Sequence, residues 1–286
     1  MSATVPPIAR VRQPGGTLGD ELAAVGVVWR RELLRFVRNR LRMVTSLVQP
    51  LLFLFILGSG LSNMLPSSGS VNYRTFMFPG ILAMTVLFTS LFSAMSIVWD
   101  REFGFLREML VAPVRRGAII VGKCAGGATV ATIQGAVLLA LAWAVHVPYS
   151  GPLLLILVGE MVLAAVARTA LGLLLSSRMK QVESFMAVMN FIVLPMFFLS
   201  GAMFPPKGLP SWLSLVTKFD PLTYAVDPLR RAVFAHVHAS AAVVQQLSAG
   251  VKWGSWTVPV GVELAILAAI GLLTLVLAIN QFARTE

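Results

Sequence analysis

Long apolar runs separated by short polar stretches dominate this chain. A membrane-spanning helix needs about 20 apolar residues, and six segments meet or approach that requirement. The run 124–159 is too long for one span, and the two prolines and the glycine of residues 146–152 divide it between two helices. The pattern therefore predicts an all-α polytopic fold with six transmembrane helices. We place these spans at residues 43–61, 75–99, 124–145, 153–175, 184–206 and 264–283.

The basic residues beside these runs are unequally distributed. Of the 23 Lys and Arg residues, 16 lie before the first span, after the sixth, and in the connections between spans two and three and between spans four and five. Only six lie in the other connections. Because Lys and Arg accumulate in cytoplasmic loops, we expect a multi-pass protein of the inner or plasma membrane with both termini in the cytoplasm.

The composition supports a membrane protein. The chain is 57% hydrophobic and 12% charged, whereas soluble proteins carry about 25% charged residues. A net charge of +11 would suggest nucleic acid as the partner of a soluble protein. Here the basic residues flank apolar runs, so we attribute the charge to topology and to anionic membrane lipids, and expect no nucleic acid.

The segment before the first span is divided into two parts. Residues 1–20 are polar and are expected to form a disordered cytoplasmic tail. Residues 21–42 are expected to form an amphipathic interfacial helix, with Trp29 on its apolar arc and Arg31, Arg35 and Arg38 opposite. The simpler alternative is that these arginines are only the positive flank of the first span.

A second amphipathic helix is predicted between spans two and three, at residues 101–112. Asp100 is suited to cap its N-terminus, Phe103 and Leu106 begin an apolar stripe, and Pro113 ends it. Flanking charges of both signs suit a protein-docking surface. A capped surface loop without a partner remains the alternative.

Residues 117–124 (GAIIVGKC) nearly match a phosphate-binding loop, with cysteine where Ser or Thr should stand. The loop would need a preceding strand and a soluble α/β domain, and a thiol is a poor ligand for Mg²⁺. We therefore reject a nucleotide site in this chain and interpret Lys123 as a cytoplasmic anchor that reaches toward the membrane surface. His236 and His238 have no third ligand in view, so no metal site is expected.

Three charged residues interrupt the apolar runs: Glu160 and Arg168 in span four and Glu263 at the start of span six. Such residues are costly in a bilayer and are candidates for a substrate or proton pathway. The alternative, which we favour, is that they form buried pairs that hold helices together. Residues 201–255, rich in Pro and aromatics, are expected to form an external re-entrant segment packed on the ends of other spans.

Three blocks of the sequence resemble a known family. They are FPGILAMTVLFTSLF (78–92), DREFGFLREMLVAPVRRGAIIVGK (100–123) and SGAMFPPKGLPSWLSLVTKFDPLTYAVDPLRR (200–231). Together they resemble the permease subunits of ABC-2 type exporters, and in particular the daunorubicin-resistance type. The likeness covers most of the chain after residue 30.

The resemblance implies the fold of a type V exporter, in which residues 43–283 form the six-helix domain and 201–231 close the pathway externally. It implies a second permease copy, identical or a paralogue, and two ATPase subunits that bind the ATP and Mg; this chain itself would hold no cofactor. Residues 101–112 match the helix that couples the permease to the ATPase. The coupling residues that it implies are Arg101, Glu102, Gly104, Phe105, Arg107 and Glu108.

The expected function is therefore a non-enzymatic permease subunit that moves an amphipathic or lipid-like substrate outward, such as a drug, lipid or glycolipid. Antibiotic or multidrug resistance would be a natural role. The alternative is a stand-alone secondary transporter of hydrophobic compounds, although we find no internal repeat of the kind such proteins often have. A membrane-embedded enzyme is disfavoured, because we see no convincing cluster of His, Asp, Glu or Cys at one depth.

Overall fold

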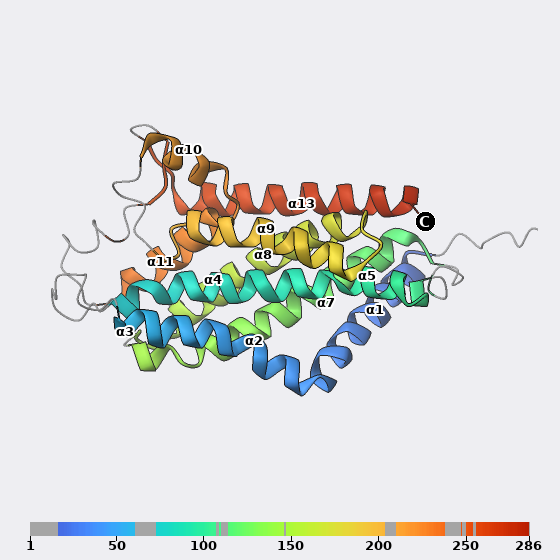
Figure 1. Cartoon of the computed structure of the whole chain (residues 1–286), viewed down its shortest axis with the longest axis horizontal. Helices are drawn as coiled ribbons and strands as arrows, with labels where there is room; N and C mark the ends of the chain where they lie inside the picture. Colours follow the sequence, from blue (N-terminus) through green and yellow to red (C-terminus); the bar gives the residue numbers. More distant parts are fainter. Residues whose placement is uncertain are drawn as a thin grey trace, which may run out of the picture.

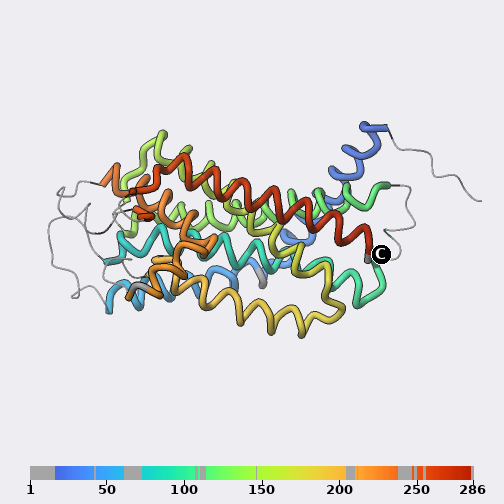
Figure 2. Tube along the Cα trace, turned by 90° about the horizontal axis from the view of Figure 1, so that it is seen from above, coloured from blue at the N-terminus to red at the C-terminus, as the bar shows by residue number. Residues whose placement is uncertain are grey.

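The computed structural model describes residues 17–60, 73–106, 109, 114–145, 147–203, 210–237, 247, 250–253 and 256–285. The long helices α4, α7, α8, α9 and α13 lie side by side along one axis, as Figures 1 and 2 show from two directions. The helical elements are α1 Leu18–Arg38, α2 Arg40–Leu52, a π-helical turn Phe53–Leu57, α3 Gly58–Gly60, α4 Tyr73–Ala94, α5 Ser96–Glu102, α7 Arg116–Leu139, a 3₁₀ turn Ala142–Val145, α8 Gly151–Ser176, α9 Val182–Leu199, α10 Ser211–Phe219, α11 Thr223–His236 and α13 Val260–Thr285. Strands β1 Lys252–Trp253 and β2 Trp256–Thr257 pair antiparallel.

The described residues contain five helical segments long and apolar enough to cross a membrane. They are Met43–Gly60, Tyr73–Glu102, Gly151–Ser176, Val182–Leu199 and Val260–Arg284. Large apolar side chains remain exposed on their outer faces, for example Phe191 and Leu272. These features, expected where helices contact lipid, make the chain a membrane protein with several apolar helices.

Helix α7, where the third of the six predicted spans should lie, is not among these five. It has 24 residues, and it carries Lys123 and Gln134, both buried. It packs against α1, α4 and α8. A helix enclosed by others can keep polar residues that a lipid-facing helix cannot, because neighbouring groups satisfy them.

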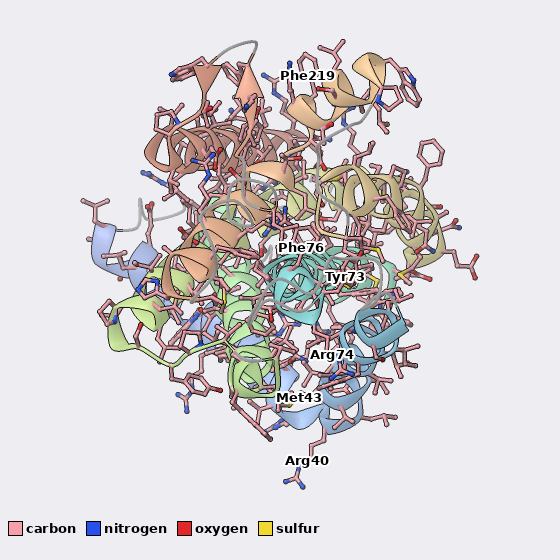
Figure 3. All side chains as sticks on the ribbon, turned by 90° about the vertical axis from the view of Figure 1, so that its left-hand side faces the viewer. Arg40, Met43, Tyr73, Arg74, Phe76 and Phe219 are labelled. Carbon is pink, nitrogen blue, oxygen red and sulfur yellow. The ribbon has the colours of Figure 1, made fainter. Side chains whose placement is uncertain are left out.

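Helix α4 is the centre of the bundle. Nearly all of its side chains are buried, against α2, α7, α8 and α11. Tyr73 and Phe76 lie in the interior in Figure 3, while Arg40 and Phe219 project from opposite edges. The Tyr73 hydroxyl donates to the Met203 carbonyl at 2.7 Å, so the start of α4 is tied to the chain that follows α9.

The bundle has two ends, which we name after the short helices found there. The α5 end holds α5, the start of α7, the end of α8 and the C-terminus, and the first turns of α1 lie at the same end (Figure 1). The α11 end holds α3, α11 and the start of α4. Both described ends of the chain therefore lie at the α5 end.

Helix α1 begins at Leu18 because Thr17 caps it. The Asp20 backbone N–H donates to the Thr17 hydroxyl at 3.3 Å, and the Asp20 carboxylate accepts from the Thr17 hydroxyl and N–H at 2.8 and 2.9 Å. These bonds favour the charged carboxylate and lower the pKa of Asp20. At the other end α1 stops at Asn39 and α2 leaves in a new direction (Figure 1), so the predicted helix 21–42 is divided between the two.

Gly80 permits the close approach of α4 to the segment after α9. A Cβ at this position would lie 2.7 Å from the Cα of Ala202, a backbone atom that cannot move aside cheaply. We expect Gly80→Ala to destabilise the fold by about 1–3 kcal/mol, the usual cost of overpacking a core. Gly60→Ala is the matched control, because no heavy atom of the described residues lies within 4 Å of its added Cβ. Equal thermal unfolding midpoints for the two purified variants would contradict the proposed contact.

Candidate functional site

The prediction that Asp100 caps a new helix is wrong. Helices α4 and α5 form one helical segment, Tyr73–Glu102, and Asp100 lies inside α5 with a fully buried side chain. Helix α5 ends at Glu102, and Gly104 then turns the chain with φ +81°. Asp100 is retained in the interior because a cation from another helix reaches it.

That cation is Lys123 of α7, and its position also corrects the sequence interpretation. Lys123 does not reach the surface; its side chain is 1% exposed. Its Nζ lies 2.6 Å from Asp100 Oδ2, 3.0 Å from Glu32 Oε1 and 2.9 Å from the Ser96 hydroxyl. All three ammonium protons therefore have acceptors, which is what a buried charge needs. We call Glu32, Ser96, Asp100 and Lys123 the lysine cluster; it joins α1, α5 and α7.

Two arginines of α1 extend this cluster toward the surface. Arg31 and Arg35 each place a guanidinium nitrogen near Asp100 Oδ1, at 3.1 and 3.4 Å. Trp29 donates from its indole N–H to the Thr129 hydroxyl of α7 at 3.1 Å. Arg38 is exposed near the end of α1. The predicted interfacial helix is therefore fastened to the bundle by Trp29, Arg31 and Arg35.

The first two predicted coupling residues contact other helices of the same chain. Arg101 donates to carbonyls at the end of α8: Ser176 at 3.3 Å, Ser177 at 3.2 Å, and Met179 just beyond. Glu102 accepts the backbone N–H of Val182 at 2.8 Å, where α9 begins. A cation at a helix C-terminus and an anion at a helix N-terminus are both favourable. The end of α5 thus fixes the turn that joins α8 to α9.

The next residues face outward. Phe103 and Phe105 are 62% and 50% exposed, and a Cβ at Gly104 would meet no atom of the described chain within 4 Å. Leu106, by contrast, is buried. Arg107 and Glu108, also predicted as coupling residues, lie outside the described residues. The α5 end therefore presents an exposed aromatic pair on a support held by Arg101 and Glu102.

The predicted intramembrane charges lie in the interior and are only partly paired. Glu263 accepts from Arg231 at 3.2 Å, and Arg231 also contacts Asp227 at 2.7 Å, so α13 is held to α11. Glu160 and Arg168 are buried, and in the part of the chain that is described Glu160 Oε2 and all three guanidinium nitrogens of Arg168 lack a hydrogen-bond partner. Of these three charges, only Glu263 therefore supports the interpretation that they form buried pairs that hold helices together.

Sequence reasoning missed the lysine cluster, although a signal was present. Glu32 is the only acidic residue among residues 29–42, and Asp100 and Lys123 delimit the connector between the second and third predicted spans. A single acidic residue in a stretch of arginines is a signal of ion pairing, but it does not identify the partner. Residues 117–124 are part of helix α7, so their backbone amides are not arranged as a phosphate cradle. Among the described residues no group of three or more His, Cys, Asp or Glu could hold a metal ion.

Comparison with known proteins places these features in a family. The model of the ABC-2 type transporter family matches residues 23–234. Nodulation protein J of Rhizobium leguminosarum bv. trifolii is 30% identical over 227 residues, which are 78% of this chain and 84% of that protein. A protein of Escherichia coli K12 named as a probable multidrug ABC transporter permease, YbhR, is 32% identical over 161 residues, 55% of this chain and 43% of its own length. The chain therefore belongs to the ABC-2 type transporter family, as a membrane permease of an ABC transporter.

Proposed function

We propose that the chain is the permease half of an exporter that moves an amphipathic or lipid-like substrate outward, using ATP hydrolysed in two separate ATPase subunits. Permeases of this family normally work with an ABC ATPase. The stretch that resembles a phosphate loop is helical here, so the nucleotide is assigned to the partner. The daunorubicin-resistance subtype and the export direction come from the sequence resemblance alone.

The proposed topology counts α7 as a sixth span beside the five apolar ones. Its 24 residues are long enough, at 1.5 Å per residue, to cross the hydrocarbon core. An even number of spans agrees with both described chain ends lying at the α5 end (Figure 1). The excess of Lys and Arg in the connections at this end supports a cytoplasmic position for it.

A second permease copy is proposed to cover the least buried spans. Of the residues in the apolar windows of Met43–Gly60 and Val182–Leu199, only 17% and 22% are buried within the chain. These two segments flank α4 and share its side of the bundle (Figure 2). A pathway between two copies would be lined by this side.

The single observation that carries the proposal is the exposed aromatic pair Phe103 and Phe105 at the α5 end. Two large apolar side chains exposed beside a positive-φ glycine are suited to insert into a groove of another protein. Arg101 and Glu102 hold their support against α8 and α9. If a bound ATPase moved this aromatic pair, the movement would therefore be transmitted directly to α8 and α9.

We expect the double variant Phe103→Ala, Phe105→Ala to lose at least tenfold of its affinity for the ATPase subunit, since central aromatic anchors contribute about 2 kcal/mol or more each. Co-purification from detergent, with the ABC ATPase subunit of this transporter as the tagged partner, measures the loss. Trp143→Ala is the matched control, because Trp143 is 66% exposed but follows α7 at the opposite end of the bundle. Equal recovery of the ATPase with all three forms, or substrate transport by the permease alone in liposomes, would overturn the proposal.

A further inference from the structure

A basic groove runs along helix α1 at the α5 end. It is a wide-open hollow of about 830 Å³, and all seven residues that line it belong to α1 or to Asn39, which ends that helix. Leu34 and Val27 form its apolar part. Its basic lining is four arginines: Arg30, Arg31, Arg35 and Arg38.

The charge of this groove is not balanced by its surroundings. Four arginines line it and Lys123 lies beneath, whereas the acidic residues that pair with this group in the described part of the chain are Glu32 and Asp100. Arg31 and Arg35 share one oxygen of Asp100. No salt bridge of Arg30 or Arg38 is seen within the described part of the chain. The groove therefore has guanidinium donors in excess, arranged for an anion.

A second cavity adjoins the groove on the side that faces the bundle. It measures about 130 Å³ and shares Arg35 and Asn39 with the groove. Phe36, Phe92 and Trp99 contribute aromatic surface to its wall, between α1 and the junction of α4 with α5. These rings give the cavity an apolar wall, which the Glu32 carboxylate and several hydroxyl groups interrupt.

A third, narrow cavity of about 20 Å³ follows between α4 and α9. It shares Phe92 with the second cavity, and Met186, Met189 and Val193 form its α9 side. Flexible methionines can repack around apolar ligands of different shape. Shared lining residues make the three cavities neighbours, and together they form a series from the four arginines of α1 to the methionines of α9.

We infer that this series is the recognition and entry site for an acidic amphiphile of the inner leaflet, with its phosphate or carboxylate on the arginines and its chain directed past Phe92 toward α9. This inference rests on the proposed function, because it names the substrate class of the same transporter. Arginine pairs bind phosphate and carboxylate in bidentate geometry. A zwitterionic amphiphile gains less from the groove, and a cationic one is repelled.

The first test measures binding to the permease alone, in nanodiscs, by bromolipid quenching of Trp99. Brominated phosphatidylglycerol is expected to quench the fluorescence of this tryptophan at least fivefold more strongly than brominated phosphatidylcholine. The Trp99→Phe variant identifies the part of the quenching that comes from Trp99. Arg30→Gln with Arg38→Gln should reduce the preference below twofold. Arg40→Gln is the matched control, since Arg40 points away from the bundle and does not line the groove (Figure 3). Equal quenching by both lipids, or displacement of the lipid by millimolar inorganic phosphate, would overturn the site.

The second test asks whether the bound amphiphile is a substrate. Lysophosphatidylglycerol, but not lysophosphatidylcholine, should stimulate ATP hydrolysis by the reconstituted complex. In the Arg30, Arg38 double variant its half-maximal concentration should rise at least fivefold, with the maximal rate unchanged. Preferential quenching without stimulation would identify a resident lipid and overturn the substrate assignment. Failure of the permease to bind an ATPase would instead refute the proposed function and leave the first test valid.

Discussion

Lys123→Met is expected to lower the stability of the folded permease more than any other single change considered for this chain. The substitution keeps the volume of the side chain but leaves Asp100 and Glu32, both at most 5% exposed, without their shared cation. Removing one partner of a buried ion pair costs about 3–5 kcal/mol, because the remaining charge stays desolvated. A thermal unfolding assay on the purified permease, with a probe on α1, measures the loss.

Two further variants distinguish charge pairing from general damage. Lys180→Met removes an exposed lysine at the same end of the bundle and should leave the midpoint unchanged. Combining Lys123→Met with Glu32→Gln also removes the acid that has no other cation among the described residues, while Asp100 keeps Arg31 and Arg35, so this double variant should recover most of the lost stability. A Lys123→Met permease as stable as the parent protein would show that the lysine cluster does not hold α1, α5 and α7 together.

The spans could be predicted from the sequence because they depend on one averaged property, apolar length. Each of the five apolar helices overlaps one of the predicted spans, even where single charged residues such as Glu160 interrupt the apolar run. The turn before α8 was also recognisable, since Ser150 caps that helix and Pro152 stands in its first turn. Such signals are local in the sequence, so these helices can be predicted without knowledge of the tertiary packing.

The lysine cluster could not be predicted because its meaning depends on three segments far apart in the sequence. Asp100 is a good N-cap residue when considered alone, and Lys123 at the edge of an apolar run is a good anchor. Each local preference is overruled once the other residue is within 2.6 Å. The role of Glu102 was hidden for the same reason, since its acceptor contact is with α9, 80 residues further along the chain.

These contacts give the α5 end a particular mechanical arrangement. One face of α5 is joined through Asp100 to α1 and α7, and its last turn is joined through Arg101 and Glu102 to α8 and α9. The aromatic pair projects from the residues that follow. Force applied there would therefore be shared between the interfacial helix and the start of α9, which borders the narrow third cavity.

Glu102→Lys is expected to reduce transport about tenfold while the permease stays folded and still binds its ATPase. The change removes the acceptor for the Val182 N–H and places a cation at the positive end of α9. Loss of this bond and the unfavourable charge together cost about 1–2 kcal/mol, which corresponds to about tenfold in the population of the connected state. Transport in proteoliposomes and permease-stimulated ATP hydrolysis should fall together, with the unfolding midpoint unchanged.

Glu183→Lys is the matched control for this prediction. Glu183 lies in the first turn of α9, one residue beyond Val182, so its reversal brings the same charge to the same helix end but leaves the bond from Val182 to Glu102 in place. We expect its effect on transport to be no more than about twofold, because a single exposed charge near a helix terminus contributes only about 0.3–1 kcal/mol. If both reversals reduced transport equally, charge at the start of α9 would explain the defect. If Glu102→Lys also abolished ATPase binding, Glu102 would belong to the docking surface rather than to the connection between α5 and α9.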